Sequence, residues 1–322
     1  MTDITLDAIK AAQQQIAGQI IHTPMLELRQ PGLEELLPKG SRAMMKLELF
    51  QKAGSFKARG CLLSVQALTP DQHAAGVTAA SGGNHALALA WAAQAAGTSA
   101  KIAIPETADP VRLEGCRALG AELVLCDDIH QAFVAMEQIA ETEGRTMVHP
   151  FEGYNMSLGS ATCGAEMFAD AANLDVVILP VGGGGLISGM SKALKLLNPK
   201  IEIFGVEPYG ADSMFRSFRA GRPERLDKVD TIADSLGSPT ALPYSYELTR
   251  ENVTNIVRIH DDDLRTTMRL MNSALKLMVE PACAASLTGA LGPLKEHCEG
   301  KNIGLLACGA NISPARFMDL TG

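Results

Sequence analysis

Short apolar segments alternate with longer segments of helical periodicity along most of the chain. The apolar segments are typical of buried strands, and helical segments end near glycines, as at Gly97, Gly120 and Gly144. The predicted strands are Ala43–Leu49, Gly76–Ala80, Lys101–Ile104, Glu122–Leu125, Val176–Val181, Ile201–Glu207 and Ile303–Ala307. The predicted helices are Leu6–Ile20, Ser55–Leu68, Asn84–Ala96, Val111–Leu119, Ile129–Thr142 and Ile187–Leu197. Such alternation predicts an α/β fold with mostly parallel sheets.

Four successive glycines, Gly182 to Gly185, lie between a predicted strand and a predicted helix. Glycines at such a turn leave backbone N–H groups free, and the helix start adds a positive dipole end, so the turn favours a phosphate. No acidic residue follows in the dinucleotide-binding pattern, and no Lys-Ser/Thr pair completes a P-loop. The alternative interpretation is a turn selected for close packing of strand and helix.

Composition narrows the class of protein. Among 322 residues, 47% are hydrophobic and the net charge is −8, with no basic run, so nucleic acid is not an expected partner. The seven cysteines form no CxxC pair, which argues against a disulfide framework and a zinc site. The acidic N-terminal segment lacks a signal-peptide core, and no apolar run reaches about 18 residues, so we expect a cytoplasmic protein without a membrane span.

Lys57 stands out because it falls in the first turn of the helix predicted for Ser55–Leu68, with Ser55 as N-cap. The positive end of a helix dipole disfavours a cation, and burial would also favour the neutral, nucleophilic amine. A lone lysine is more often a solvated surface charge, so the interpretation depends on its neighbours.

Those neighbours resemble a known family. The run Gly54-Ser55-Phe56-Lys57-Ala58-Arg59-Gly60 is similar to the cofactor-lysine motif of fold type II pyridoxal-phosphate enzymes, the tryptophan synthase β superfamily. The match is to the branch that holds threonine/serine dehydratases and serine racemases, and it covers essentially the whole chain. Further similar motifs occur in the family's order: His22-Thr23-Pro24, Ser81-Gly82-Gly83-Asn84-His85, His149-Pro150-Phe151, Gly182–Gly185, Val206-Glu207-Pro208, Thr231–Asp234, Glu280-Pro281-Ala282 and Cys308-Gly309-Ala310-Asn311.

The resemblance implies two domains, each with a mostly parallel sheet flanked by helices, and pyridoxal 5'-phosphate between them. Residues 1–68 and 149–322 would form the large cofactor-binding domain. Residues 69–148 would form a small domain that closes over the substrate.

The resemblance also assigns roles. Lys57 would bind the cofactor covalently and take the Cα proton. Phe56 would lie against the pyridine ring, although a core aromatic is the alternative, and Asn84 would donate to the phenolic oxygen, although it could simply cap a helix. The phosphate would be held by Gly182, Gly183, Gly184, Gly185 and Leu186, and the substrate carboxylate by Ser81, Gly82, Gly83, Asn84 and His85.

Three departures from the family pattern carry information. Serine racemases have a second serine where this chain has Gly82, and racemisation needs proton donors on both faces, so Gly82 favours elimination. By the resemblance, Cys308 would occupy the position at which the family has a serine beside the pyridine nitrogen. A thiol is a weak hydrogen-bond donor to that nitrogen, which suits a reaction with only a short-lived carbanion. Where relatives bind Mg²⁺ or another divalent cation, this chain has Glu207, Ala211 and Ser213, with a hydroxyl replacing the last carboxylate.

The sequence therefore predicts a pyridoxal-phosphate-dependent ammonia-lyase that converts a β-hydroxy-α-amino acid, such as L-threonine or L-serine, to a 2-oxo acid and ammonia. The racemase arginine that would meet a distal carboxylate aligns with Ala132, which favours a neutral side chain. The alternatives are an L-threo-3-hydroxyaspartate dehydratase, a serine racemase-like or β-replacement enzyme, and a non-catalytic nucleotide-binding α/β protein. The family resemblance implies a homo-oligomer, with a dimer favoured.

Overall fold

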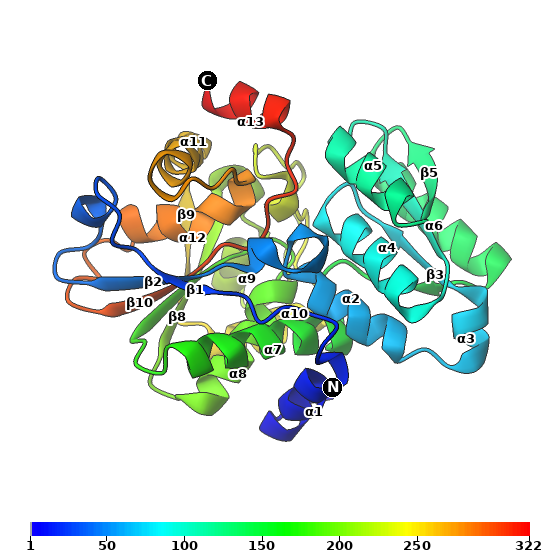
Figure 1. Cartoon of the computed structure of the whole chain (residues 1–322), viewed down its shortest axis with the longest axis horizontal. Coiled ribbons are helices and arrows are strands. Elements are labelled where there is room, and N and C mark those ends of the chain that lie inside the picture. The colour runs from blue at the N-terminus through cyan, green and yellow to red at the C-terminus, as the bar shows by residue number, and fades with distance from the viewer. Residues whose placement is uncertain (1) are drawn as a thin grey trace.

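The computed structural model describes residues 2–322, which fold around two sheets (Figure 1). The first sheet has the strand order β1-β2-β10-β7-β8-β9, and the second has the order β5-β4-β3-β6. All neighbouring strands run parallel except β1 and β2. The strands are β1 (Met25–Glu27), β2 (Arg42–Lys46), β3 (Val77–Ala80), β4 (Ala100–Pro105), β5 (Glu122–Cys126), β6 (Thr146–Met147), β7 (Val176–Pro180), β8 (Glu202–Pro208), β9 (Asn255–Ile259) and β10 (Asn302–Leu306).

Helices cover both sheets, so the predicted α/β fold is confirmed. They are α1 (Leu6–Ile16), α2 (Lys57–Gln66), α3 (Pro70–Ala75), α4 (Asn84–Ala96), α5 (Pro110–Ala118), α6 (Ile129–Glu143), α7 (Tyr154–Asp170), α8 (Gly185–Leu197), α9 (Ser213–Ala220), α10 (Pro243–Asn252), α11 (Asp261–Leu270), α12 (Pro281–Leu291) and α13 (Pro314–Thr321). Each of these helices is too short or too polar to span a lipid bilayer.

Strand β7, in the middle of the first sheet, is apolar throughout because helices cover both of its faces. Val176, Val177 and Ile178 of β7 are fully buried, and β10 pairs with them by placing Ile303 opposite Val176. In Figure 1 this sheet and its helices form one group, and the second sheet with α4, α5 and α6 forms another. Helix α2 packs against α4 and α7 and therefore lies at the junction of the two groups.

Three sequence expectations differ from the structure at element ends. The first helix ends at Ile16 rather than Ile20, and β2 ends at Lys46 before the short 3₁₀ turn of Glu48–Phe50. Ser55 does not cap α2, so that prediction is wrong. Its backbone is extended and bridges to Gly309, which moves the helix start to Lys57.

Candidate active site

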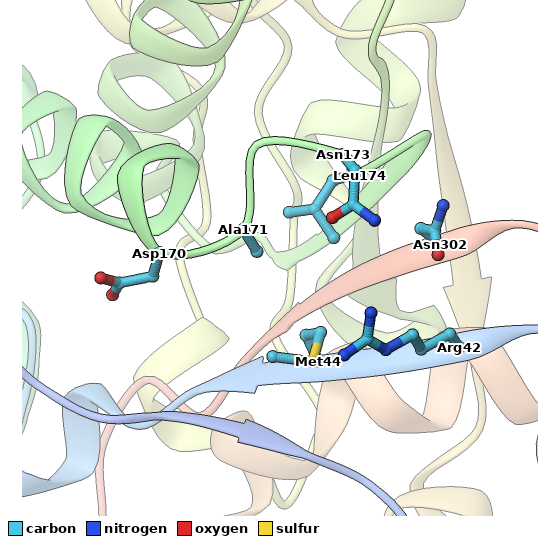
Figure 2. Close-up of a pocket in the computed structure, with 7 residues that line it drawn as sticks. All are labelled: Arg42, Met44, Asp170, Ala171, Asn173, Leu174 and Asn302. Carbon is cyan, nitrogen blue, oxygen red and sulfur yellow. The ribbon is translucent and has the colours of Figure 1, made fainter.

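A cleft of about 1350 Å³ lies between the two sheets at the carboxyl ends of their strands. Ser81 follows β3, Pro105 ends β4, Pro180 ends β7 and Cys308 follows β10, and all four line this cleft. Ligands of parallel α/β sheets bind at this edge. A smaller cavity of about 100 Å³ is shown in Figure 2. It lies where β2 and β10 begin, beside Arg42 and Asn302, and is therefore at the opposite edge of the sheet.

The glycine turn forms one wall of the cleft, between β7 and α8. Within the described chain, no protein acceptor takes the backbone N–H groups of Gly182 through Ile187. A Cβ on Gly183 would lie 2.3 Å from the Phe151 ring, and one on Gly185 would lie 2.6 Å from the Phe151 carbonyl oxygen. The glycines therefore serve two purposes: they permit close packing, and they leave a set of donors suited to a phosphate.

Lys57 enters the cleft from the first turn of α2. Its Nζ donates to the carbonyl oxygen of Pro150 and lies 5.0 Å from the centroid of the buried Phe56 ring. Burial lowers the pKa of Lys57 to about 8. The amine is therefore much closer to its neutral, nucleophilic form at physiological pH than a surface lysine is.

Asn84 lies in a buried hydrogen-bond network at the start of α4. Its Nδ2 donates to Glu280 Oε1 at 2.6 Å, and its Oδ1 accepts from Asn311 Nδ2 at 2.7 Å. Burial raises the pKa of Glu280 to about 7, against the opposing effect of the Arg112 cation. One amide hydrogen of Asn84 remains available for a ligand.

The Arg112 side chain is fixed by hydrogen bonds and an ion pair. It donates to the carbonyl oxygens of Asn311 and Gly82, at 2.9 and 3.1 Å, and pairs with Asp234. These partners show that the donors of the Arg112 guanidinium are already engaged within the protein.

The loop after β3 carries the predicted substrate-binding residues. The N–H groups of Gly82, Asn84 and His85 have no protein acceptor among residues 2–322, whereas Gly83 N–H donates to Ser81 Oγ at 3.1 Å. The His85 ring is turned into the protein, with Nε2 2.8 Å from the Val148 carbonyl oxygen. Burial and the nearby Lys57 charge lower the pKa of His85 to about 3, so this ring is neutral and structural.

Cys308 is buried directly after β10. The neighbouring Cys283 thiol and burial raise the pKa of Cys308 well above its usual value. Its sulfur is therefore a neutral thiol, as the sequence interpretation assumed.

The predicted metal ligands Glu207, Ala211 and Ser213 lie together at the end of β8, and all are buried. Both Glu207 carboxylate oxygens accept backbone N–H groups, from Met214 at 2.9 Å and Phe215 at 2.7 Å. A cation at this position would compete with these donors. The described residues contain no cluster of three His, Cys, Asp or Glu side chains arranged for a metal, so the metal site stays a prediction.

Comparison with known proteins gives a consistent assignment. The model of the family described as "Pyridoxal-phosphate dependent enzyme" matches residues 16–309. Phenylserine dehydratase of Ralstonia pickettii is 48% identical over 278 residues, which are 86% of this chain and 85% of that protein. L-threonine ammonia-lyase of Thermotoga maritima is 34% identical over 96% of this chain and 76% of its own length. The structure of maize serine racemase superposes with a TM-score of 0.92 at 31% identity, covering 99% of this chain and 97% of its own. The resemblance found in the sequence is thus confirmed, and the chain belongs to the pyridoxal-phosphate-dependent enzyme family.

Proposed function

We propose that the protein dehydrates a β-hydroxy-α-amino acid and releases a 2-oxo acid and ammonia. The observation that carries this proposal is the place of Lys57. Its amine, shifted toward neutrality by burial, lies in one cleft with the free N–H groups of the glycine turn and of the loop after β3.

Pyridoxal phosphate fits these residues. Free N–H groups from Gly182 to Leu186 would hold its phosphate, Lys57 would bind it covalently, and Phe56 would border its ring. When bound, the cofactor supplies the electron sink that makes the Cα proton acidic. Asn84 would use its remaining amide hydrogen on the cofactor's phenolic oxygen, while Cys308 would offer only a weak donor near the ring nitrogen.

Separate groups of the protein would bind the substrate and transfer the proton. Free N–H groups in the loop Ser81–His85 would bind the substrate carboxylate at the start of α4, where the helix dipole favours an anion. Lys57 would accept the proton from Cα, and the hydroxyl would leave Cβ with the bonding electron pair. The hydrogen lost from Cα and the hydroxyl lost from Cβ together make one water molecule.

We infer from part of the cleft lining that the preferred β-substituent is apolar and bulky. Ile129, Phe133 and Val134 of α6 line the cleft together with His130 and Glu137 of the same helix, while Ala132 is fully buried in the core. No cationic group replaces the racemase arginine at that place. Together with the relative named phenylserine dehydratase, this wall supports β-phenylserine as the preferred substrate, ahead of L-threonine, L-serine and L-threo-3-hydroxyaspartate.

Serine racemases are also among the relatives, so racemisation is the second candidate. Gly82 argues against it because glycine has no side chain to carry a proton on the second face. Membership of an enzyme family removes the support for a non-catalytic nucleotide-binding protein.

Three further expectations stay proposals. The four strands of the second sheet fall within residues 77–147, which supports a small domain of residues 69–148 beside a large domain of residues 1–68 and 149–322. A homodimer is likewise proposed from the family resemblance, and a cytoplasmic location from the composition of the sequence.

The test is a substrate panel on the protein reconstituted with pyridoxal phosphate. We expect 2-oxo acid and ammonia from L-threo-β-phenylserine at the highest kcat/KM, smaller rates with L-threonine and L-serine, and no activity in Lys57→Ala. Borohydride reduction followed by mass spectrometry should place the pyridoxyl group on Lys57. A D-amino acid as the main product, or absence of oxo acid from every member of the panel, would overturn the proposal.

A further inference from the structure

His149 lies in a loop between β6 and α7, directly before Pro150, whose carbonyl oxygen accepts from Lys57. Its Nδ1 receives two backbone N–H groups, from Phe151 at 3.3 Å and Glu152 at 3.0 Å. Because both partners are donors, Nδ1 must be the unprotonated nitrogen. The proton of the neutral ring is therefore on Nε2.

The ring is held neutral, and its remaining donor is free. Burial, with a further contribution from the Lys57 charge, lowers the pKa of His149 to about 4. His149 Nε2 has no hydrogen-bond partner within residues 2–322, although the residue lines the cleft. His85 differs, because its Nε2 is bound to the Val148 carbonyl oxygen.

Two phenylalanine rings lie near the His149 ring. Its ring meets Phe151 edge to face, with centroids 4.6 Å apart, and Phe151 contacts the glycine turn at Gly183. On the other side the Phe133 ring of α6 lies 6.2 Å away, in the wall assigned to the β-substituent. The imidazole thus lies in the cleft next to the residue whose carbonyl oxygen accepts from Lys57, and near Phe133 in the wall proposed for the β-substituent.

We propose that His149 is a catalytic residue that donates a hydrogen bond from Nε2 to the β-hydroxyl oxygen of the substrate. This inference rests on the proposed dehydratase function.

In the step concerned, the Cα–H bond breaks and its proton passes to the Lys57 amine. The electron pair of the broken C–H bond forms the Cα=Cβ double bond, and the Cβ–O bond breaks with its electron pair on oxygen. That oxygen takes up the proton that Lys57 removed from Cα and leaves as water. His149 keeps its own proton, since losing it would make an imidazolate, and it stabilises the negative charge that develops on the leaving oxygen.

Two substitutions separate this role from a structural one. His149→Asn keeps an acceptor near Nδ1 for the backbone N–H groups of Phe151 and Glu152 but removes the Nε2 donor. His149→Gln places an amide donor nearer to the Nε2 position. Each variant is assayed as holoenzyme with a β-hydroxy substrate and with β-chloro-L-alanine, whose chloride leaves without a hydrogen-bond donor.

We expect His149→Asn to lower kcat for the β-hydroxy substrate by about 10²-fold. KM and elimination from β-chloro-L-alanine should change by only about threefold, because these depend on binding and on Lys57. His149→Gln should recover part of the lost kcat. Nitrogen-15 NMR of histidine-labelled protein should show His149 as the neutral Nε2–H form down to about pH 5.

Equal losses with the hydroxy and chloro substrates would show a structural role and overturn the inference, as would full activity of His149→Asn or protonation of the ring near pH 6.5. These outcomes differ from failure of the proposed function, in which the wild-type enzyme itself would form no oxo acid from any β-hydroxy amino acid.

Discussion

Asn84 donates its side-chain amide to Glu280 across 2.6 Å, and this hydrogen bond joins the two walls of the cleft. Asn84 begins α4, which packs on the second sheet, while Glu280 precedes α12, which packs on the first. Glu280 is fully buried and also receives the Arg112 guanidinium at 3.4 Å. The carboxyl group therefore orients the amide that is proposed to meet the cofactor.

Replacing Glu280 tests this orientation. We expect Glu280→Ala to weaken the affinity for pyridoxal phosphate about tenfold or more, because Asn84 and Arg112 both lose a buried acceptor. Glu280→Gln keeps an acceptor for Asn84, so its affinity for pyridoxal phosphate should decrease less. Spectroscopic titration of apo-protein gives both dissociation constants, and equal, wild-type affinities in the two variants would contradict the role assigned to Glu280.

The pH dependence of covalent cofactor capture tests the Lys57 environment. Only the unprotonated amine attacks an aldehyde, so the capture rate should rise with pH and level off above about 8, the pKa to which burial lowers Lys57. Stopped-flow absorbance on apo-protein measures this profile. The exposed Lys52 should not substitute in Lys57→Ala, and a rate still rising at pH 10 would mean that Lys57 titrates like a surface lysine.

Phe133 is the predicted determinant of preference for an aryl substituent. Burying an aromatic side chain contributes about 1.5–3 kcal/mol, so Phe133→Ala should lower kcat/KM for β-phenylserine about 10- to 100-fold relative to L-serine. Phe133→Leu should lower it less because it retains most of the apolar wall. Steady-state kinetics with β-phenylserine and L-serine test this role. An unchanged ratio of the two kcat/KM values in Phe133→Ala would mean that the substituent binds elsewhere.

Substitution of Arg59 tests how much its buried ion pairs stabilise the fold around the helix that carries Lys57. Its buried guanidinium pairs with Glu48 at 2.8 Å and Glu166 at 2.9 Å. Removing one member of a buried ion pair costs about 3–5 kcal/mol, so Arg59→Ala should lower the free energy of unfolding by that amount. Arg42→Ala breaks an exposed pair with Glu27 and should cost about 0–1 kcal/mol. Urea unfolding at pH 7 measures the free energy of unfolding of both variants. Similar decreases in Arg59→Ala and Arg42→Ala would contradict the greater importance of the buried pair.

The buried ion pairs of Arg59 also predict that the stability of the fold decreases in acid. Burial opposes ionisation of Glu48, yet Arg59 holds the pKa of this carboxyl below its usual value. A lowered carboxyl pKa in the folded protein stabilises the fold above the pKa of the unfolded chain, and that stabilisation is lost as pH falls. The wild-type free energy of unfolding should therefore decrease below about pH 4.5, and less steeply in Glu48→Gln.

Local patterns were sufficient to predict seven of the ten strands, the lysine motif and the glycine turn, because each is a contiguous run, but β1, β6 and β9 were missed. Ser55 was assigned a helix cap from that same local pattern, but pairing with Gly309 extends its backbone. The role of Glu280 could not be predicted, since it depends on a partner 196 residues away. The tautomer of His149 likewise follows from backbone directions in a folded loop, which no spacing of residues reveals.

The wall proposed for the β-substituent comes from α6, whereas Lys57 and the glycine turn belong to α2 and to the loop between β7 and α8. Under the proposed function, substrate choice and reaction chemistry are encoded in separate stretches of the gene. Evolution, or a protein engineer, can vary the first while the second stays intact, so one scaffold can yield lyases for many different amino acids.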